Sequence, residues 1–331
     1  MRAIRVDQPG GREQLRLVEI PMPTPAAGEV LIRVAYAAAN WGDVQKRQGI
    51  YPDPVTYPMI LGAEVSGVIA AHGPGTRRAQ VGSRAAAVCG PKMLGGYAEF
   101  VAVPAEYLLP LPDSIPLRTA ATLPVAALTA YHLLHTAYRV RRSDTILIHA
   151  IAGAVGLALT QLAMLTGATV IGTVGSGAKA RLPRRYGAAR VIDRSREDFV
   201  AAAMTFTDGR GVDLVIDSLG GDILPRSFDA LRAYGRVINI GEAAGEPDFP
   251  VRKKLYERST ALAGFELLHA VPGSAIWRRG VSRIISLAAK GQLKMPIAGA
   301  YPLEDCARLH ETFEQRGTSG KLLLEVDRTL R

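Results

Sequence analysis

The chain has 331 residues, enough for two domains that each bury a core. Its composition, 48% hydrophobic and 21% charged residues, is that of a soluble globular protein. The net charge of +10 comes from separate basic doublets such as Arg141-Arg142, not from a basic run interleaved with aromatic residues. Nucleic acid is therefore not the expected partner, and a small anionic ligand would suit the positive charge.

Cysteine usage and the first residues bear on the compartment. Cys89 and Cys306 are far apart and offer neither a disulfide framework nor a metal-binding spacing. Residues 1–7 contain no apolar segment of the signal-peptide kind, so we expect a cytoplasmic protein. No charged residue occurs between Thr145 and Ala178, but interior glycines and a change of periodicity argue against a membrane helix there.

Residues 1–120 predict a mostly β domain. Short apolar or alternating segments are separated by turns rich in Gly and Pro, a pattern typical of a compact, barrel-like domain. A short helix is expected to begin near Asn40. The expected strands are 1–6, 15–19, 29–37, 60–70, 82–89 and 97–103.

Residues 120–331 change to an alternation of strands and helices. A helical connector at 120–137 leads into six strands with helical stretches between them, which predicts an α/β Rossmann fold with a doubly wound parallel sheet. Helices near 274–290 and 303–316 and a strand at 321–326 are expected to return to the first domain. The expected strands of the sheet are 145–150, 168–174, 190–193, 212–217, 235–240 and 260–265.

The stretch 144–179 carries the clearest chemical signal. Between its two buried strands lies a turn with the spacing Ala150-x-x-Gly153-x-x-Gly156, followed by an apolar helix that Gly167 is placed to end. Bare backbone N–H groups at a helix N-terminus favour a pyrophosphate. This βαβ context predicts a dinucleotide site in the turn, formed by Ala152, Gly153, Ala154, Val155 and Gly156.

The end of the second strand indicates which dinucleotide binds. An NAD site would carry Asp or Glu there to hold the ribose 2′-hydroxyl. Residues 172–176 read Gly-Thr-Val-Gly-Ser without an acid, and Lys179 follows. Because hydroxyls and cations suit a 2′-phosphate, we predict NADPH as the cofactor.

These residues resemble the zinc-independent medium-chain dehydrogenases/reductases, in the branch of quinone oxidoreductases and enoyl reductases, over essentially the whole length. The resemblance implies a GroES-like catalytic domain at 1–123 and 267–331, a Rossmann NADPH-binding domain at 124–266, and a homodimer formed through the last strand of the Rossmann sheet. Its landmarks include Asn40-Trp-Gly-Asp43, Arg47-x-Gly49-x-Tyr51-Pro52, Leu61-Gly-x-Glu64, Leu128-Thr-Ala-Tyr131 and the turn at 150–156.

The resemblance also indicates the reaction class. In the zinc-dependent branch a Cys stands where Asn40 stands and a His where Ala63 stands, so no tetrahedral zinc site can be built here and we expect no metal. Without a Lewis acid, alcohol oxidation is disfavoured. Hydride addition to a polarised C=C bond remains, in which negative charge on a carbonyl oxygen meets positioned donors and the α-carbon receives a proton.

The resemblance assigns the active-site positions to Asn40, Asp43, Tyr51 and Thr129. Asn40 and Thr129 would place the nicotinamide or polarise the carbonyl group, and Tyr51 would lie against the substrate or be only a turn aromatic. Asp43 would be a catalytic group or only a helix N-terminal acid. Glu64 is expected to be a buried structural acid. The cofactor positions comprise the turn residues above with Ser176, Lys179, Arg194, Ser218, Ile240, Gly241, Phe265 and Lys321.

Three functions remain open. The first is NADPH-dependent reduction of a conjugated C=C bond in an enone, an enoyl thioester or a biosynthetic intermediate. The second is NADPH:quinone oxidoreduction, and the third is NADPH binding with little catalysis. Gln45, where quinone-reducing relatives often carry Tyr, and Gly264-Phe265, which resembles a pair in enoyl thioester reductases, favour the first.

Overall fold

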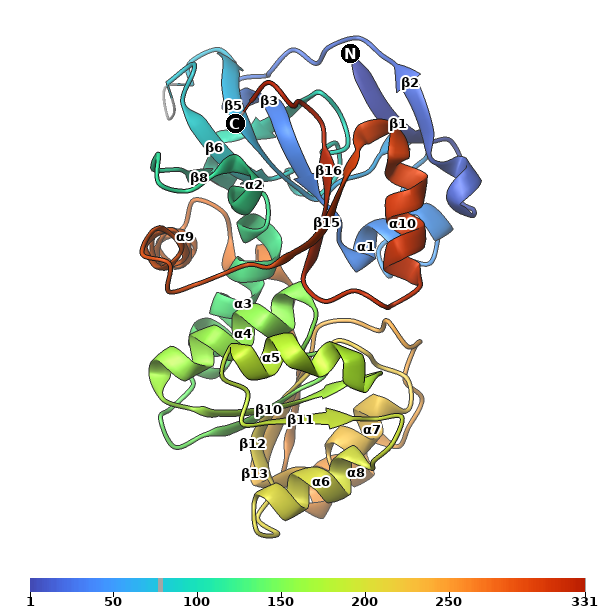
Figure 1. Cartoon of the computed structure of the whole chain (residues 1–331), viewed down its shortest axis with the longest axis vertical. Coiled ribbons are helices and arrows are strands. Elements are labelled where there is room, and N and C mark those ends of the chain that lie inside the picture. Colours follow the sequence, from blue (N-terminus) through green and yellow to red (C-terminus); the bar gives the residue numbers. More distant parts are fainter. Residues whose placement is uncertain (77–79, 331) are drawn as a thin grey trace. The chain divides into compact units, whose positions relative to one another are not determined.

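The computed structural model describes residues 1–76 and 80–330 of the chain. They form two compact units, one of Met1–Leu128 with Ala270–Arg331 (unit 1) and one of Thr129–His269 (unit 2), coloured along the chain in Figure 1. The boundaries expected from the sequence lie a few residues from these. A doubly wound parallel sheet and a separate mostly β part are both present, as predicted. No helix of the described residues is long and apolar enough to cross a membrane.

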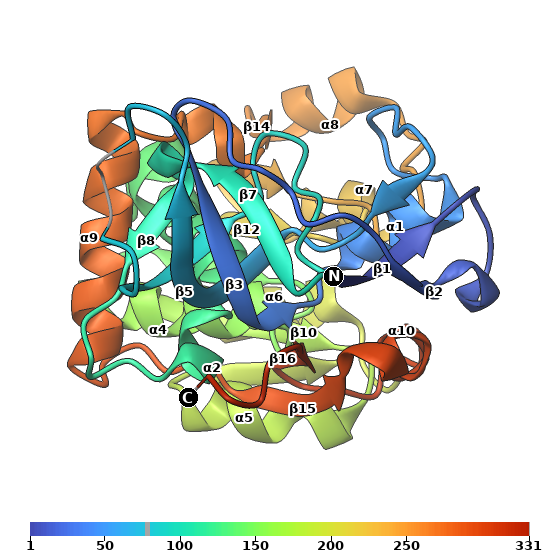
Figure 2. The ribbon, with the colours of Figure 1, turned by 90° about the horizontal axis from the view of Figure 1, so that it is seen from above.

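Unit 1 is built on a seven-stranded sheet and a three-stranded sheet. The larger sheet has the order β15-β16-β3-β5-β6-β8 with β7 also paired to β3, and the smaller has the order β2-β1-β4. Figure 2 shows β3 between β5 and β7, with which it pairs antiparallel. The strands are β1 (Arg2–Val6), β2 (Arg16–Glu19), β3 (Glu29–Ala38), β4 (Met59–Ile60), β5 (Glu64–His72), β6 (Arg84–Val88), β7 (Phe100–Pro104), β8 (Leu108–Pro110), β15 (Ile297–Pro302) and β16 (Lys321–Glu325).

The helices of unit 1 are mostly short. The longest, α9 (Ala275–Ala289), begins at Ser274, whose side chain accepts a hydrogen bond from the backbone N–H of Trp277. Its buried positions, among them Ile284 and Leu287, recur at helical spacing. The others are α1 (Trp41–Gln48), α2 (Leu117–Ala120), α10 (Cys306–Glu314), the 3₁₀-helices η1 (Arg12–Gln14), η2 (Ala105–Tyr107) and η7 (Leu303–Asp305), and the π-helix η3 (Leu123–Ala127).

Unit 2 is a six-stranded parallel sheet with the order β11-β10-β9-β12-β13-β14. The order of the strands reverses between β9 and β12, where ligands bind in sheets of this type. Figure 1 shows α4 and α5 on one face of this sheet and α6, α7 and α8 on the other. The strands are β9 (Thr145–Ile148), β10 (Thr169–Val174), β11 (Arg190–Asp193), β12 (Val212–Asp217), β13 (Leu231–Asn239) and β14 (Ala261–Gly264).

The helices of unit 2 connect these strands. Helix α4 (Ala154–Thr166) ends at Gly167, which adopts φ +83°, as the sequence predicted. A Cβ on Gly156 would lie 2.6 Å from the carbonyl oxygen of Ile151, so only glycine lets α4 pack this closely. The others are α3 (Leu128–His132), α5 (Arg181–Arg185), α6 (Phe199–Phe206), α7 (Ile223–Ser227), α8 (Val251–Glu257), the π-helix η4 (Leu133–Tyr138), and the 3₁₀-helices η5 (Gly177–Ala180) and η6 (Leu267–Ala270).

One sequence expectation is wrong in detail. The strand expected at 60–70 is divided into β4 and β5, because Gly62 adopts φ +104° and its backbone lies against Tyr97. The helical connector expected at 120–137 is present as η3, α3 and η4, preceded by α2, with Pro124 inside η3. The short strands β8 and β15 were not expected.

Candidate active site

The carboxyl edge of the unit 2 sheet gathers the predicted cofactor residues. Because all six strands run parallel, the loops that follow them leave from one edge. The loop after each strand carries at least one predicted residue. Gly153 follows β9, Ser176 follows β10, Arg194 follows β11, Ser218 follows β12, Ile240 and Gly241 follow β13, and Phe265 follows β14.

The N-terminus of α4 lies at this edge and suits a pyrophosphate. Gly153 is the N-cap residue, and no side chain accepts a hydrogen bond at this cap. The first turn of α4 contains no acidic residue, and Gly153 is exposed while Ala154 and Val155 are half-buried. The backbone N–H groups of a helix N-terminus need acceptors, so an anionic group would fit this turn.

The loop after β10 is held by an acid of the neighbouring strand. Asp193 accepts hydrogen bonds from the backbone N–H (3.0 Å) and the hydroxyl (2.7 Å) of Ser195, which lower the pKa of its carboxyl group. A Cβ on Gly177 would lie 3.0 Å from the same carboxylate, and one on Gly175 would lie 3.9 Å from Nη2 of Arg194. The guanidinium of Arg194 therefore lies beside the loop that carries Ser176, while Lys179 lies in η5.

The loops after β12 and β13 are fixed by Asp217 and Asn239. The buried carboxylate of Asp217 accepts from the backbone N–H groups of Leu219 (2.9 Å) and Gly220 (3.1 Å) and from Nδ2 of Asn239 (3.1 Å). Burial raises the pKa of Asp217, and these hydrogen bonds oppose that rise. Asn239 was not predicted from the sequence, where its signal was only its position at the end of a strand.

His149 follows β9 directly and was also missed. Its Nδ1 lies 2.9 Å from Oγ1 of Thr173 and its Nε2 lies 3.0 Å from Oγ of Ser227. The Ser227 hydroxyl donates to the carbonyl of Ile223 (2.8 Å), so its oxygen accepts from Nε2–H of His149, and Nδ1 accepts from Thr173. Burial lowers the pKa of His149 to about 3, so the ring is neutral and joins β9 to β10 and α7.

Unit 1 contains a buried polar cluster of Asn40, Glu64 and Lys321. Nζ of Lys321 lies 2.6 Å from Oε1 of Glu64 and 2.5 Å from Oδ1 of Asn40. Glu64 is 0% exposed and Lys321 is 4% exposed, while Asn40 is half-buried. The second carboxylate oxygen of Glu64 accepts from the backbone N–H of Val125 (2.8 Å). Glu64 is thus a buried acid, as expected, and it is paired with a cation from the last strand.

The orientation of the Asn40 amide follows from its partners. Lys321 can only donate, so the oxygen of the amide faces its ammonium group. Nδ2 of Asn40 donates to Oε1 of Glu64 (3.1 Å) and to the carbonyl of Ala38 (3.2 Å). Both N–H groups of the amide are therefore engaged, and Oδ1 keeps the remaining capacity to accept a hydrogen bond.

Asp43 holds Asn40 in place at the start of α1. Its Oδ2 accepts from the backbone N–H of Asn40 (2.8 Å) and from the hydroxyl of Tyr97 (3.2 Å), and its Oδ1 accepts from the N–H of Gly62 (3.3 Å). Burial raises the pKa of Asp43, which is 1% exposed, although the charge of Lys46 and these hydrogen bonds oppose the rise. Asp43 is thus a buried acid in the first turn of α1 that binds the backbone of Asn40.

The other two predicted active-site residues belong to different units. Tyr51, in unit 1, packs over the start of α1, because a Cβ on Gly42 would lie 3.2 Å from its Cε2. Thr129, in unit 2, lies in α3 and is buried, and no hydrogen bond to its hydroxyl is found within the described part of the chain. The structure thus brings Asn40 and Asp43 together, and the ring of Tyr51, which follows α1 in the chain, packs against the first turn of this helix.

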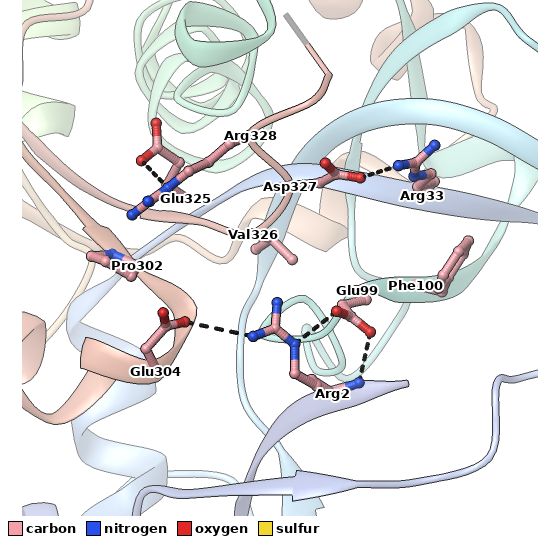
Figure 3. A pocket seen from close by; sticks show the side chains of 10 residues that line it. All are labelled: Arg2, Arg33, Glu99, Phe100, Pro302, Glu304, Glu325, Val326, Asp327 and Arg328. Atoms are coloured by element: carbon pink, nitrogen blue, oxygen red, sulfur yellow. Dashed lines mark hydrogen bonds and ion pairs between the residues drawn. The ribbon is translucent and has the colours of Figure 1, made fainter.

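A separate cavity in unit 1 does not belong to this site. It has a volume of about 530 Å³, and Figure 3 shows its charged side chains turned toward one another. Arg2 pairs with Glu99 (2.8 Å) and Arg33 with Asp327 (2.5 Å). Arg33 precedes Asn40 by seven residues, most of them in strand β3, which is roughly 20 Å of extended chain. Across residues 1–76 and 80–330 no group of three or more His, Cys, Asp or Glu could hold a metal ion.

Comparison with known proteins identifies the family. Residues 26–113 match the family described as alcohol dehydrogenase GroES-like domain, and residues 154–283 match the zinc-binding dehydrogenase family. A probable quinone oxidoreductase of Schizosaccharomyces pombe is 34% identical over 97% of this chain and 96% of its own length. A 2-haloacrylate reductase of a Burkholderia species is 32% identical over 96% of this chain and 97% of its own length.

A solved structure agrees with these matches. The Escherichia coli quinone oxidoreductase complexed with NADPH superposes with a TM-score of 0.94 at 32% identity, over 98% of this chain and 100% of that one. The mostly β unit is thus GroES-like, as the resemblance implied. The chain belongs to the zinc-independent medium-chain dehydrogenases/reductases, in the branch of quinone oxidoreductases and enoyl reductases.

Proposed function

We propose that this protein is an NADPH-dependent reductase that adds hydride to a conjugated C=C bond of an enone, an enoyl thioester or a biosynthetic intermediate. The cluster of Asn40, Glu64 and Lys321 carries the proposal. Where the zinc-dependent branch places a metal ligand, this chain has an amide held between an ammonium group and a carboxylate. Such a set can orient groups by hydrogen bonding, but it offers no soft ligand for zinc.

NADPH is the cofactor of this oxidoreductase. When bound, it supplies the hydride that reduces an electron-poor carbon. Three features of unit 2 support this choice: the uncapped N-terminus of α4, the absence of an acid at the end of β10, and the cations Lys179 and Arg194 near Ser176. The solved Escherichia coli relative is named as a complex with NADPH.

The partners of Asn40 suggest its role. With both N–H groups engaged, Asn40 can accept a hydrogen bond at Oδ1 but cannot donate one without losing a bond to Glu64 or Ala38. We therefore assign Asn40 to positioning an N–H donor such as a carboxamide. Lys321, which the sequence assigned to the cofactor, orients Asn40 through its ammonium group.

The remaining active-site positions supply a donor and a contact surface. Thr129 is the group we assign to donate to the carbonyl oxygen on which charge develops, because no other hydrogen bond engages its hydroxyl in the described residues. Tyr51 lies against the substrate, with its ring supported by the backbone of Gly42. Asp43 acts through Asn40 and is not itself a catalytic group.

Quinone reduction with the same cofactor is the second candidate. The Schizosaccharomyces pombe and Escherichia coli relatives are both named quinone oxidoreductases. The Burkholderia relative is named for 2-haloacrylate, in which a C=C bond is conjugated with a carboxyl group. Together with Gln45 and Gly264-Phe265, this relative is our reason for placing C=C reduction first.

We further propose that the protein is a cytoplasmic homodimer joined through β14. This strand lies at the end of the sheet order, and Ala261, Leu262 and Ala263 are only half-buried. Helix α8, which precedes β14, contains no buried residue. An unpaired edge strand of this kind can pair with a second copy. Light scattering after size-exclusion chromatography would test the stoichiometry, and a monomeric mass would contradict it.

The test of function is NADPH oxidation, followed by absorbance, against an ortho-quinone, crotonyl-CoA, an N-acetylcysteamine enoyl thioester and a simple enone. Faster turnover of the enone or the thioesters than of the quinone would support C=C reduction. Turnover of the quinone alone would favour the second candidate. Tight NADPH binding without turnover of any of the four would favour a binding protein with little catalysis. Metal analysis of the active protein is expected to find no stoichiometric zinc.

A further inference from the structure

Lys46 is a buried cation of unit 1 to which the proposed mechanism assigns no role. It lies in α1, three residues after Asp43, and is 4% exposed. Its Nζ donates to the carbonyl oxygens of Lys92 (2.8 Å) and Met93 (3.1 Å). The same nitrogen lies 4.8 Å from the centroid of the Tyr51 ring. An ammonium group has three N–H donors, so two carbonyl groups and one aromatic face account for all of them.

This arrangement is unusual because the charge is held without an ion pair. Among the described residues, no carboxylate oxygen lies within 4.0 Å of Nζ of Lys46. Burial lowers the pKa of Lys46, and the charge of Asp43 is the largest opposing influence. A buried ammonium group is stable only when its donors are satisfied, so its position depends on the loop at 92–93 and on Tyr51 together.

The loop that Lys46 binds is locally strained. Met93 adopts φ +49°, a left-handed conformation that costs a residue other than glycine on the order of 1 kcal/mol or more. Its backbone N–H bonds to the carbonyl of Gly90 (3.1 Å), which closes a tight turn. The carbonyl groups of Lys92 and Met93 both accept from the ammonium group of Lys46, so the cation is bonded to the strained residue and to the one before it.

The segment that carries Tyr51 is tied to the same residue twice. The ammonium group of Lys46 lies over the ring of Tyr51, and a Cβ on Gly42 would lie 3.2 Å from Cε2 of the same ring. The hydroxyl of Tyr57, at the other end of the segment, donates to the backbone carbonyl of Lys46 (2.5 Å). Lys46 thus joins three parts of unit 1: helix α1, the turn at 90–93 and the segment 51–57.

We propose that Lys46 is a positioning residue that holds the Tyr51 ring and the turn at 92–93 in one fixed arrangement beside the start of α1. This inference rests on the proposed function to the extent that Tyr51 lies against the substrate. Lys46 itself touches no reacting atom. Its effect on the reaction passes through Tyr51, and its effect on the turn does not depend on catalysis.

A double-variant cycle tests the effect on the reaction. Lys46→Met keeps the length of the side chain but removes the charge, and we expect it to lower kcat/KM about tenfold, a value between those of exposed and fully desolvated cation–π contacts. In a Tyr51→Leu background the same change is expected to lower kcat/KM less than twofold. Lys46→Arg should retain most of the wild-type value. Equal losses from Lys46→Met in both backgrounds would overturn the proposal.

Arg84→Met serves as the matched control. The guanidinium of Arg84 also caps two loop carbonyl groups of unit 1, those of Asp113 (3.0 Å) and Ile115 (2.5 Å). Arg84 begins β6 at the end opposite Val88, and Val88 pairs with Glu64. Loss of this cation is expected to leave kcat/KM within twofold of the wild type. A tenfold loss here would show that removal of any carbonyl-capping cation disturbs the site, and would contradict the proposal.

Limited proteolysis tests the effect on the turn without reference to activity. Lys92 is exposed, and trypsin cleaves after lysine, so the rate of cleavage between Lys92 and Met93 reports opening of the turn. Mass spectrometry should find this cleavage about tenfold faster in Lys46→Met and unchanged in Lys46→Arg. An unchanged rate in Lys46→Met would overturn the proposal. If the wild type turned over no substrate, the proposed function would fail, and this rate would still decide the role of Lys46 in the turn.

Discussion

The polar cluster of unit 1 and the carboxyl edge of unit 2 hold their functional groups in opposite ways. In unit 1, the side chains of Asn40, Glu64 and Lys321 are buried and satisfy one another. In unit 2, Gly153 at the N-terminus of α4 and Ser176 after β10 are exposed at the edge of the sheet. A variant in the cluster of unit 1 should therefore change the stability of the fold or the orientation of the remaining side chains of the cluster. A variant at the edge of unit 2 should change the affinity for the cofactor.

The largest effect is expected from breaking the buried ion pair. Glu64→Ala leaves the ammonium group of Lys321 buried with, among the described residues, Asn40 alone as a partner, and should lower the free energy of unfolding by about 3–5 kcal/mol. Urea denaturation measures this change. The exposed pair of Lys253 and Glu257 is the control, since Glu257→Gln should lower the free energy of unfolding by less than about 0.5 kcal/mol.

Removal of both charges tests whether the loss of stability comes from the unpaired charge of Lys321. In Glu64→Leu/Lys321→Met no charge is left unpaired, so the double variant should be more stable than Glu64→Ala, although the bond from the N–H of Val125 is also lost. A double variant less stable than the single one would contradict the view that the unpaired cation causes the loss.

Variants at the carboxyl edge of unit 2 should change the affinity for NADPH and leave the free energy of unfolding unchanged. Lys179→Ala combined with Arg194→Ala is expected to weaken NADPH about 100-fold, roughly 2.7 kcal/mol, because charge-assisted contacts to the 2′-phosphate are lost. Binding of NADH, which lacks that phosphate, should change less than threefold. Titration calorimetry with both nucleotides measures the difference, and equal losses would remove both residues from the 2′-phosphate site.

The difference between the two regions also explains what the sequence could predict. The turn at 150–156, the helix that ends at Gly167 and the strand after it lie within one short stretch. Their signals are local: a buried strand, a glycine spacing and a helical period. Because the strands of the sheet are parallel, the residues that follow them could be assigned to one edge before the structure was known.

The cluster of unit 1 offered no such local signal. Asn40 and Lys321 are separated by 281 positions, and their contact exists only because β16 pairs with β3. The resemblance to a family supplied Asn40 and Lys321 but not the bond between them. Lys46 was missed because its partners lie in two segments outside α1, at Tyr51 and at 92–93, and no spacing in α1 distinguishes a buried lysine from a solvated one.

His149 connects the strands beneath the edge and should make unit 2 sensitive to acid. Its pKa is lowered by burial to about 3 in the folded state, below the ordinary value of about 6.5. As the pH falls below about 6.5, the unfolded chain binds a proton that the folded chain does not, so stability is lost by about 1.4 kcal/mol per pH unit. At pH 5 this loss is about 2 kcal/mol.

His149→Asn isolates this contribution. The variant should be less stable than the wild type at pH 8, because the hydrogen bonds to Thr173 and Ser227 are altered. Between pH 6 and pH 4, however, the free energy of unfolding of the variant should fall less steeply than that of the wild type, by about 1.4 kcal/mol per pH unit. Urea denaturation across this range measures the slope. His132 and His310, with pKa values lowered to about 4 and about 3, remain in both proteins and cancel in the comparison.

Within the buried cluster, the smallest stability change is expected at Asn40. Asn40→Ala removes the amide but leaves Glu64 and Lys321 paired, so the free energy of unfolding should fall by only about 1 kcal/mol. If Asn40 positions an N–H donor through Oδ1, kcat should fall about tenfold, because an aligned group is lost without loss of the fold.

Asn40→Asp keeps an acceptor at this place but sets a second carboxyl group beside Glu64, which raises the energy of the ionised pair. Its activity should therefore recover as the pH is lowered, whereas that of Asn40→Ala should not. Steady-state kinetics of the two variants across pH, with the wild type beside them, would separate an acceptor role from simple filling of space, and identical profiles for both variants would contradict the positioning role.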